Sequence, residues 1–216
     1  MSLGRGSLSP VTVSINEVLT SQREFVQARE WEKFHTTKNL AMALGGEVGE
    51  LAVELSAILD TNTMDAFVRS GVVDEVGDVT LYLLRMYDVI GCNPPDRVFS
   101  CADELPARVE IMPMTPSRQL AVLGSVCELA GTCGRILETL QWARDDAVVD
   151  QELTGTILTR LDTFGRALMT ICRLVDVNPI EAALAKNIKN IKKYPVELSR
   201  GSSRKYTDLT KDAVDG

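Results

Sequence analysis

The sequence predicts an all-α protein, a helical bundle made of two fused repeats in one chain. Apolar residues recur every three or four positions through most of the chain, which is the period of an amphipathic helix. The 216 residues, 45% of them hydrophobic, suffice for one large core or two small fused cores. A shift of 85 positions aligns the second half with the first. Residues 8–15 alternate like a strand, but no partner strand is predicted.

Each expected helix begins at a capping residue or ends at a helix breaker. Ser14 or Asn16 would cap the first helix, and Thr36 or Thr37 the second. Gly91 and the Asn-Pro-Pro turn after it would end the third. The expected helices cover residues 15–31, 38–59, 65 or 72 to 90, 118–144, 151–177 and 179–192, with a loop at 60–63 and a connector with one short helix at 96–117.

The repeat is visible in matching glycines and in a matching helix stop. The G-x-x-G of residues 46–49 falls on that of residues 131–134, and Asn93-Pro94 falls on Asn178-Pro179, each 85 positions further on. A duplicated helical unit explains both matches. The expected organisation is a flexible terminus at 1–14, a repeat with the metal site at 15–95, the connector at 96–117, a degenerate repeat at 118–195 and a tail at 196–216.

Two short motifs carry the candidate chemistry, Glu47-Val-Gly-Glu50 and Glu75-Val-Gly-Asp78. Residues three apart share one face of a helix, and such a pair of acids is commonly a solvated face. If the two faces meet, four carboxylates converge and their repulsion requires a cation. Oxygen ligands without His or Cys suit Mg²⁺, with Mn²⁺ as the alternative. Gly46, Gly49 and Gly77 predict close helix packing there, because glycine inside a helix costs about 1 kcal/mol.

The second repeat lacks all four acids. Their counterparts 85 positions on are Thr132, Arg135, Arg160 and Thr163. A guanidinium has five donors and no acceptor, so it cannot bind a metal ion. We therefore predict one metal site per chain, in the first repeat. The two arginines have a packing role, which we favour, or they hold a substrate phosphate or pair with an acid across the repeat interface.

Composition excludes several classes of partner. The net charge of -7 argues against nucleic-acid and anionic-membrane binding. Five scattered cysteines without C-x-x-C spacing are expected to be reduced core thiols of a cytoplasmic protein. No apolar run is expected to approach the roughly 18 residues of a membrane span. The first ten residues lack the apolar segment of a secretory signal.

The residues around the acids resemble a known family, the dCTP pyrophosphatases of the MazG-like all-α NTP pyrophosphohydrolase superfamily. The acidic pairs alone mark the superfamily, whereas the W-x-x-F-H opening and the KYPV tail point to the dCTP branch. The matching segments are residues 31–40, 46–51, 74–83, 186–200 and 203–207. The family's usual chain forms a helical dimer, so this chain resembles such a dimer fused into one polypeptide. A homodimer of the fused chain stays open.

The resemblance implies Mg²⁺-dependent hydrolysis between the α and β phosphates of dCTP or a related pyrimidine deoxynucleotide, which removes it from the nucleotide pool. It implies that Glu47, Glu50, Glu75 and Asp78 hold the metal. Glu47 or Glu50 would also accept a proton from the attacking water. Because the first repeat keeps the acids and the second keeps the tail, the resemblance implies one composite site.

Further residues are candidates for substrate binding. The family usually has a tryptophan where this chain has Ala57, and the repeat register moves that position to Trp142, which is a base-stacking or a core residue. His35 is the only histidine and is expected to be structural rather than a general base. The other candidates are Lys38, Lys186, Lys193 and Arg200 for phosphates, Asn39 and Asn190 for sugar or base or as helix caps, Tyr82 for the deoxyribose, Trp31 and Phe34 for the walls of a base pocket or for the core, and Tyr194 of the tail motif for substrate binding.

Two alternatives to a dCTP-specific enzyme stay open. One is a broader hydrolase that also accepts dUTP or modified pyrimidine nucleotides. The other is a non-catalytic, nucleotide-binding helical scaffold that lost turnover together with its second site. Retention of all four acids in the first repeat argues against the scaffold.

Overall fold

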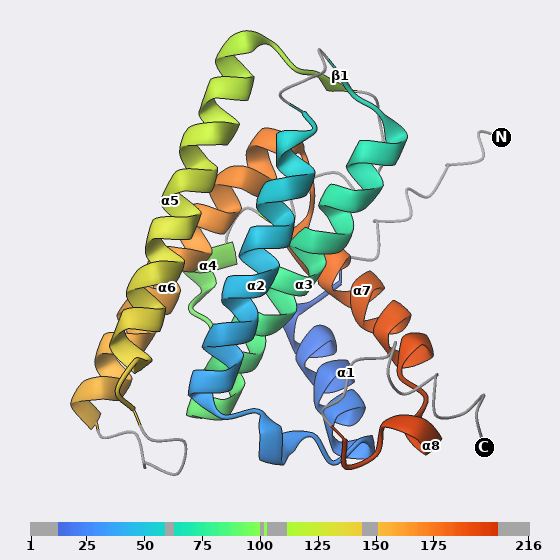
Figure 1. Ribbon diagram of the computed structural model, residues 1–216, viewed down its shortest axis with the longest axis vertical. Helices are drawn as coiled ribbons and strands as arrows, with labels where there is room; N and C mark the ends of the chain where they lie inside the picture. Colours follow the sequence, from blue (N-terminus) through green and yellow to red (C-terminus); the bar gives the residue numbers. More distant parts are fainter. Residues whose placement is uncertain (1–12, 59–62, 100–101, 103–111, 144–150, 203–216) are drawn as a thin grey trace, which may run out of the picture.

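The computed structural model describes residues 13–58, 63–99, 102, 112–143 and 151–202. It is all-α, as predicted, with one short antiparallel pairing of two-residue strands (Figure 1). The elements are α1 (Ile15–Ala28), the 3₁₀ helix η1 (Glu32–Phe34), α2 (Thr37–Ser56), β1 (Thr63–Met64), α3 (Ala66–Ile90), α4 (Asp96–Phe99), β2 (Met112–Pro113), α5 (Pro116–Leu140), α6 (Gln151–Val175), α7 (Pro179–Lys193) and α8 (Val196–Ser199).

The core lies among four long helices, α2, α3, α5 and α6. Helix α2 packs against both α3 and α5, and α6 packs against α5 (Figure 1). Leu44, Val48, Leu51 and Leu55 form the buried stripe of α2 at helical spacing. The β1–β2 pairing joins the segments that precede α3 and α5.

Helices α1 and α7 form a second layer against α3. Arg29, just after α1, is buried and donates hydrogen bonds to the carbonyls of Ile191 and Tyr194 near the end of α7. The indole N–H of Trp31 donates to the Ser199 carbonyl in α8, at 3.0 Å. These bonds fasten the last described segment to the residues between α1 and α2. Residues 186–194 are thereby brought beside the acidic motifs.

Glycine packing agrees with the prediction at one position only. A Cβ on Gly77 would lie 2.7 Å from the Ala182 carbonyl oxygen and 2.8 Å from Lys186 Cβ, so glycine is what lets α7 approach α3. The close packing predicted at Gly46 and Gly49 is wrong. Both are exposed, and a Cβ on either would meet nothing within 4 Å.

The helix starts follow the predicted caps, but the helices expected to end at residues 31, 59 and 144 end earlier, at Ala28, Ser56 and Leu140. Ser14 accepts from the Glu17 N–H and forms a capping box, and Thr36 accepts from the Asn39 N–H. Gly91 follows α3 at φ +78°. The predicted loop at 60–63 is corrected at Thr63, which belongs to β1. Residues 1–12, 59–62 and 203–216 lie outside the described residues.

One pair of helices matches between the two halves. Helices α3 and α6 are each 25 residues long, and their bounds are 85 positions apart. Each is followed by a residue at positive φ, Gly91 at +78° and Asp176 at +57°. Each end is closed by a 3.0 Å backbone hydrogen bond to a carbonyl five residues earlier. This correspondence supports the duplicated unit, which stays a prediction.

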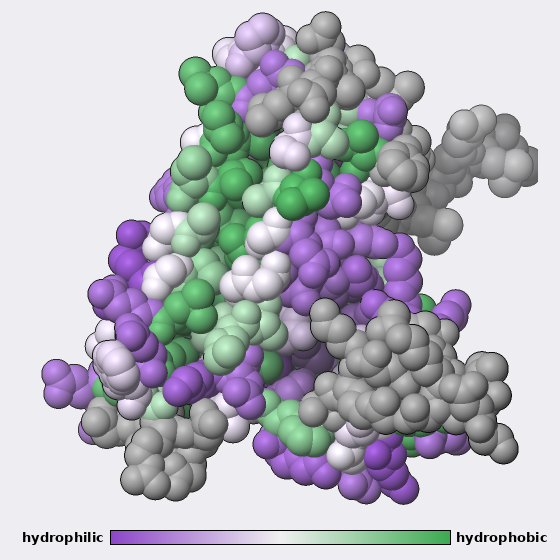
Figure 2. Space-filling view, in the orientation of Figure 1, coloured by the Kyte–Doolittle hydropathy of each residue, from purple (hydrophilic) through white to green (hydrophobic). Residues whose placement is uncertain are grey.

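The outer face of α5 departs from two expectations. Cys133 and Cys172 are buried as expected, but Cys127 is exposed, so the prediction of core thiols is wrong there because Cys127 lies on the outward side of the helix. By length and composition alone, helix α5 could also cross a membrane, which contradicts the expectation that no apolar run is long enough. Hydrophobic surface follows the side of the molecule formed by α5 and α2 (Figure 2). The large hydrophobic residues exposed on these two helices are Met42, Val53, Leu120 and Leu123.

Candidate active site

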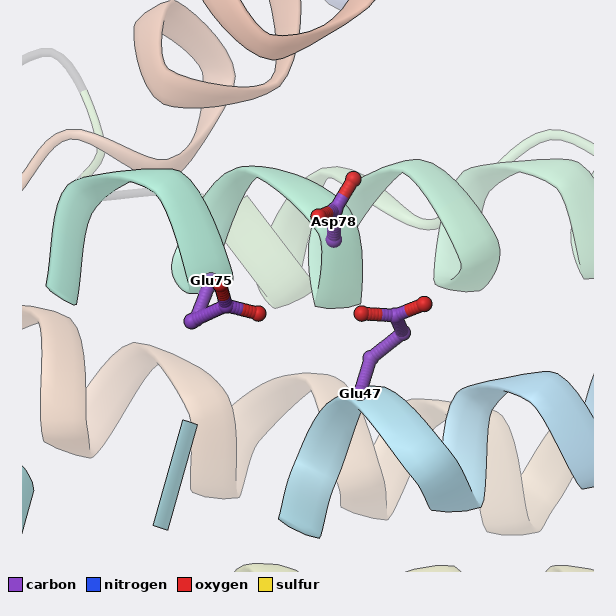
Figure 3. A group of neighbouring side chains, drawn as sticks. All are labelled: Glu47, Glu75 and Asp78. Carbon is purple, nitrogen blue, oxygen red and sulfur yellow. The ribbon is translucent and has the colours of Figure 1, made fainter. Parts of the chain in front are cut away.

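Three of the four predicted metal ligands converge. Glu47 on α2 points across to Glu75 and Asp78 on α3 (Figure 3). One carboxylate oxygen from each lies within 4.8 Å of the others. The apolar stripes of α2 and α3 face each other, and this packing turns the acidic residues beside them toward a shared cavity. Glu50 is exposed and lines the same cavity without joining the group of three.

Crowding makes these carboxyl groups hard to ionise together. Burial, and then the charges of Asp78, Glu50 and Glu75, raise the pKa of Glu47 to about 7. Burial likewise raises the pKa of Glu75 to about 7, although Lys186 opposes the shift. The pKa of Asp78 is also raised by burial, against a hydrogen bond from Lys186. The cluster therefore favours binding of positive charge.

The Glu75 carboxylate is only partly satisfied by the protein. Its Oε2 is buried and has no hydrogen-bond partner among the described residues. A buried oxygen without a partner costs on the order of 1–3 kcal/mol, more for a charged group. A divalent cation among Glu47, Glu75 and Asp78 would satisfy it, and three carboxylates match the hard-oxygen preference of Mg²⁺ or Mn²⁺. The residues present therefore fit a metal ion.

The acids form one end of a cavity of about 510 Å³. This volume is in the range of small-molecule sites. The predicted residues that line it, besides the four acids, are Trp31, Phe34, His35, Tyr82, Lys186, Asn190, Lys193 and Tyr194. Tyr82 lies close to the acids. Burial raises the pKa of its hydroxyl, and the charges of Glu47 and Asp78 raise it further.

The second half of the chain supplies the cationic wall of the cavity. Lys186 on α7 pairs with Asp78 at 2.6 Å, and Asn190 one turn later also hydrogen-bonds to Asp78. Burial lowers the pKa of Lys186, but the bond to Asp78 and the charges of Glu75 and Asp74 outweigh it, so the net pKa is raised and the ammonium stays charged. The cavity is therefore composite, as the division of motifs between the halves implied.

The other end of the cavity is aromatic. The Trp31 ring lies edge-on to Phe25 and to Tyr194, with centroids 5.4 and 5.3 Å apart. Its indole N–H is already bonded to Ser199, so Trp31 offers a ring surface and no free donor. Phe34 and His35, in and just after η1, continue this wall.

Three of the lining residues that were not predicted from the sequence are polar and buried, namely Gln22, Arg85 and Asn187. Gln22 on α1 donates its amide to the Leu81 carbonyl at 2.9 Å, and its Oε1 is buried without a partner among the described residues. Arg85 on α3 donates its Nε–H to His35 Nδ1 at 3.1 Å. Arg85 falls two turns after Asp78 on the helix face that carries Glu75, and this spacing was a usable signal. Gln22 lies on an amphipathic helix with nothing in its pattern to mark it.

Six predicted residues lie outside the cavity. The ammonium of Lys38 donates to the Ala143 carbonyl, and the amide of Asn39 donates to the Phe34 carbonyl, so both fix the start of α2. Trp142 is 86% exposed beyond the end of α5, neither core nor cavity wall. Arg200 pairs with Glu30 at the surface. Arg160 donates to the carbonyl of Arg135 on the neighbouring helix, which is the packing role favoured from the sequence.

The chain is similar to curated proteins named dCTP pyrophosphatase 1. It is 34% identical to the Homo sapiens protein over 87 residues, 38% of this chain and 51% of that protein. It is 32% identical to the Mus musculus protein over 94 residues, 42% and 55% of the two chains, and 32% to the Rattus norvegicus protein over 104 residues, 46% and 61%. The chain spans about half the length of these relatives. No family model and no solved structure matches it.

Proposed function

We propose that this protein is a Mg²⁺-dependent nucleoside triphosphate pyrophosphohydrolase that acts on dCTP or a related pyrimidine deoxynucleotide. The products would be the nucleoside monophosphate and pyrophosphate. The single observation that carries the proposal is the convergence of Glu47, Glu75 and Asp78 at one end of a cavity whose other end is aromatic. The similarity to dCTP pyrophosphatase 1 supports the reaction and the base.

The acidic end would handle the phosphates. Glu47, Glu75 and Asp78 would hold a divalent cation, which neutralises phosphate charge and lowers the pKa of a bound water. Glu50 lines the cavity outside this group, so it is the carboxylate left to accept a proton from the attacking water. Mn²⁺ is the alternative ion.

The α7 wall would hold the rest of the triphosphate. Lys186 and Lys193 present two positive charges to the cavity, and Asn190 lies between them on the same helix face. When a nucleotide enters, the Lys186 ammonium can bind a phosphate oxygen at the position where it now binds Asp78. The aromatic rings of Trp31 and Phe34 would cover the base, and Tyr82 would contact the sugar.

The site would belong to a single chain. The acids come from α2 and α3 in the first repeat and the cations from α7 in the second. This arrangement supports the proposal of a fused tandem repeat with one active site. A homodimer of the fused chain, and a cytoplasmic location, are further proposals.

The test is pyrophosphate release from a panel of dCTP, dUTP, dTTP, dATP and dGTP, with Mg²⁺ and with EDTA. We expect Mg²⁺-dependent release that is fastest with dCTP. Glu47→Gln should reduce kcat/KM by about a hundredfold or more, because one ligand of the charge-neutralising ion is lost. Glu128→Gln is the control and should leave kcat/KM unchanged, since Glu128 is an exposed acid on α5 that does not line the cavity.

The panel also separates the alternatives. Similar rates with dUTP and dCTP would indicate the broader pyrimidine hydrolase. Nucleotide binding with no pyrophosphate from any substrate would indicate the non-catalytic scaffold. Full activity in Glu47→Gln would refute the metal assignment.

A further inference from the structure

The aromatic end of the cavity contains a buried arginine. Arg85 on α3 is 8% exposed and lines the cavity beside His35. One guanidinium nitrogen binds the carboxylate of Asp88, which also pairs with Arg23 on α1. The Nε–H of Arg85 donates to His35 Nδ1 at 3.1 Å. The charge of Arg85 is therefore balanced by Asp88, and its Nε–H donor is directed at the histidine.

This hydrogen bond fixes the proton on the imidazole ring. A guanidinium has only donors, so His35 Nδ1 must be the unprotonated nitrogen that accepts. In a neutral imidazole the other nitrogen then carries the hydrogen. His35 is thereby assigned as the Nε2–H tautomer, a hydrogen-bond donor. Within the described part of the chain, no acceptor is bonded to Nε2 of this cavity-lining residue.

The ring also stays neutral at ordinary pH. Burial and the charge of Arg85 lower the pKa of His35 to about 4, and Glu32 opposes this only in part. The charged groups around the ring are Arg85 and Asp88 from α3, Arg23 from α1 and Glu32 from its own segment. Only Arg85 contacts the imidazole directly among these.

The donor lies at the distance from the acids that a nucleotide requires. Glu75, Asp78, Tyr82 and Arg85 form one stripe along α3, and all four line the cavity. Seven residues of helix from Asp78 to Arg85 span about 10 Å. If the phosphates bind at Asp78 and the sugar at Tyr82, the base lies beside the His35 ring, to which Arg85 donates a hydrogen bond.

We propose that Arg85 is a positioning residue, which locks His35 as an Nε2–H donor to an acceptor atom of the nucleobase, a ring nitrogen or a carbonyl oxygen. This inference rests on the proposed function for the identity of the ligand. The tautomer lock is a property of the protein alone. The two parts are tested separately.

The first test is ¹⁵N NMR of the imidazole, which is unambiguous because His35 is the only histidine in the chain. We expect the wild type to show a single Nε2–H tautomer that does not protonate above pH 5. In Arg85→Met the two tautomers should mix and the pKa of the ring should rise, while burial still holds it below its ordinary value. Arg23→Met is the matched control, since it removes the other arginine of Asp88 without touching the histidine. A wild type with mixed tautomers, or an Arg85→Met ring unchanged from wild type, would overturn the lock.

The second test adds the α,β-imido analogue of dCTP with Mg²⁺. We expect the Nε2 resonance to shift as its proton bonds to the base, whereas the triphosphate alone should leave it unchanged. In turnover, Arg85→Met should raise KM for dCTP about tenfold, with kcat within about twofold. If the Nε2 resonance does not shift when the nucleotide analogue is added, the base contact is refuted. This outcome can be observed even if Arg85→Met is too unstable to assay. Absence of pyrophosphate release by wild type, with the lock and the shift observed, would refute the proposed function instead.

Discussion

Glu75 shows how one side chain can predict a ligand. Its Oε2 is buried without a partner among the described residues, and its pKa is raised to about 7. Without a counterion, an ionised carboxylate in this position destabilises the folded chain. The same features become favourable when a divalent cation binds.

Removal of that carboxylate should separate stability from metal binding. We expect Glu75→Gln to raise the Tm measured in EDTA, because the neutral amide relieves repulsion from Asp78 and Glu47. Wild type should gain about 2.7 kcal/mol at a Mg²⁺ concentration one hundred times its Kd, several degrees in Tm. Glu75→Gln should lose most of that gain in calorimetry. Equal Mg²⁺ shifts in both proteins would show that the ion binds elsewhere.

His35 gives a pH dependence of definite sign. Its folded pKa of about 4 lies below the unfolded value of 6.5, so the unfolded chain binds a proton between these values that the folded chain does not. Neutral His35 therefore contributes to the free energy of unfolding above pH 6.5, and this contribution is lost as the pH falls toward 4. Relative to His35→Gln, wild type should lose about 2–3 kcal/mol over this window. Chemical denaturation of both proteins at pH 7 and pH 4 measures the difference, from which the opposing contributions of Glu47 and Glu75 cancel. A constant difference would contradict the neutral, buried histidine.

At the scale of helices, the contact of α7 with α3 decides whether the site is complete. It depends on Gly77, where a Cβ would lie 2.7 Å from a backbone oxygen of α7. The pairs Lys186–Asp78 and Lys189–Asp74 both cross this contact. A small displacement of α7 would therefore move two cations away from the acids at once.

Two glycine substitutions test this contact. Gly77→Ala should push α7 outward, lower Tm and raise KM for the triphosphate several-fold. Gly124→Ala, at an exposed position of α5 with nothing within 4 Å of the added Cβ, should instead stabilise the protein by about 0.5–1 kcal/mol and leave kinetics unchanged. Thermal melts and KM values of both variants provide the comparison. Normal KM and Tm in Gly77→Ala would show that α7 is not held by this approach.

The sequence predicts helices better than it predicts contacts between them. Apolar periodicity and caps such as Ser14 and Thr36 are local, and the helices followed them. Gly46, Gly49 and Gly77 look alike in sequence, yet only Gly77 faces a neighbouring helix closely. Arg85 could have been found from its spacing after Asp78, whereas Gln22 belongs to the cavity through the packing of α1 on α3, which local patterns do not encode.

For the whole molecule, the predicted fusion has a kinetic signature. One chain provides both the acids of α2 and α3 and the cations of α7, so no second chain is needed to complete the cavity. The exposed apolar surface along α5 and α2 leaves room for a homodimer, which stays a prediction (Figure 2).

Dilution tests this self-sufficiency. We expect specific activity per chain to stay constant from micromolar to nanomolar protein, and calorimetric titration to give one nucleotide per chain. Size-exclusion chromatography with light scattering at the same concentrations reports whether chains associate. Activity that declines on dilution in step with dissociation would show that a second copy contributes to the site.

The acids and the cations of the cavity lie far apart in the sequence, so the acids are synthesised well before the cations. Lys189 reaches back across 115 residues to Asp74, so the acidic side of α3 is finished long before α7 emerges from the ribosome. Until then Asp74 and Asp78 lack the two lysines that pair with them in the folded protein. Under the proposed function, a nucleotide would bind only once the final helices have docked, and a nonsense mutation ahead of α7 would remove the cationic wall of the cavity.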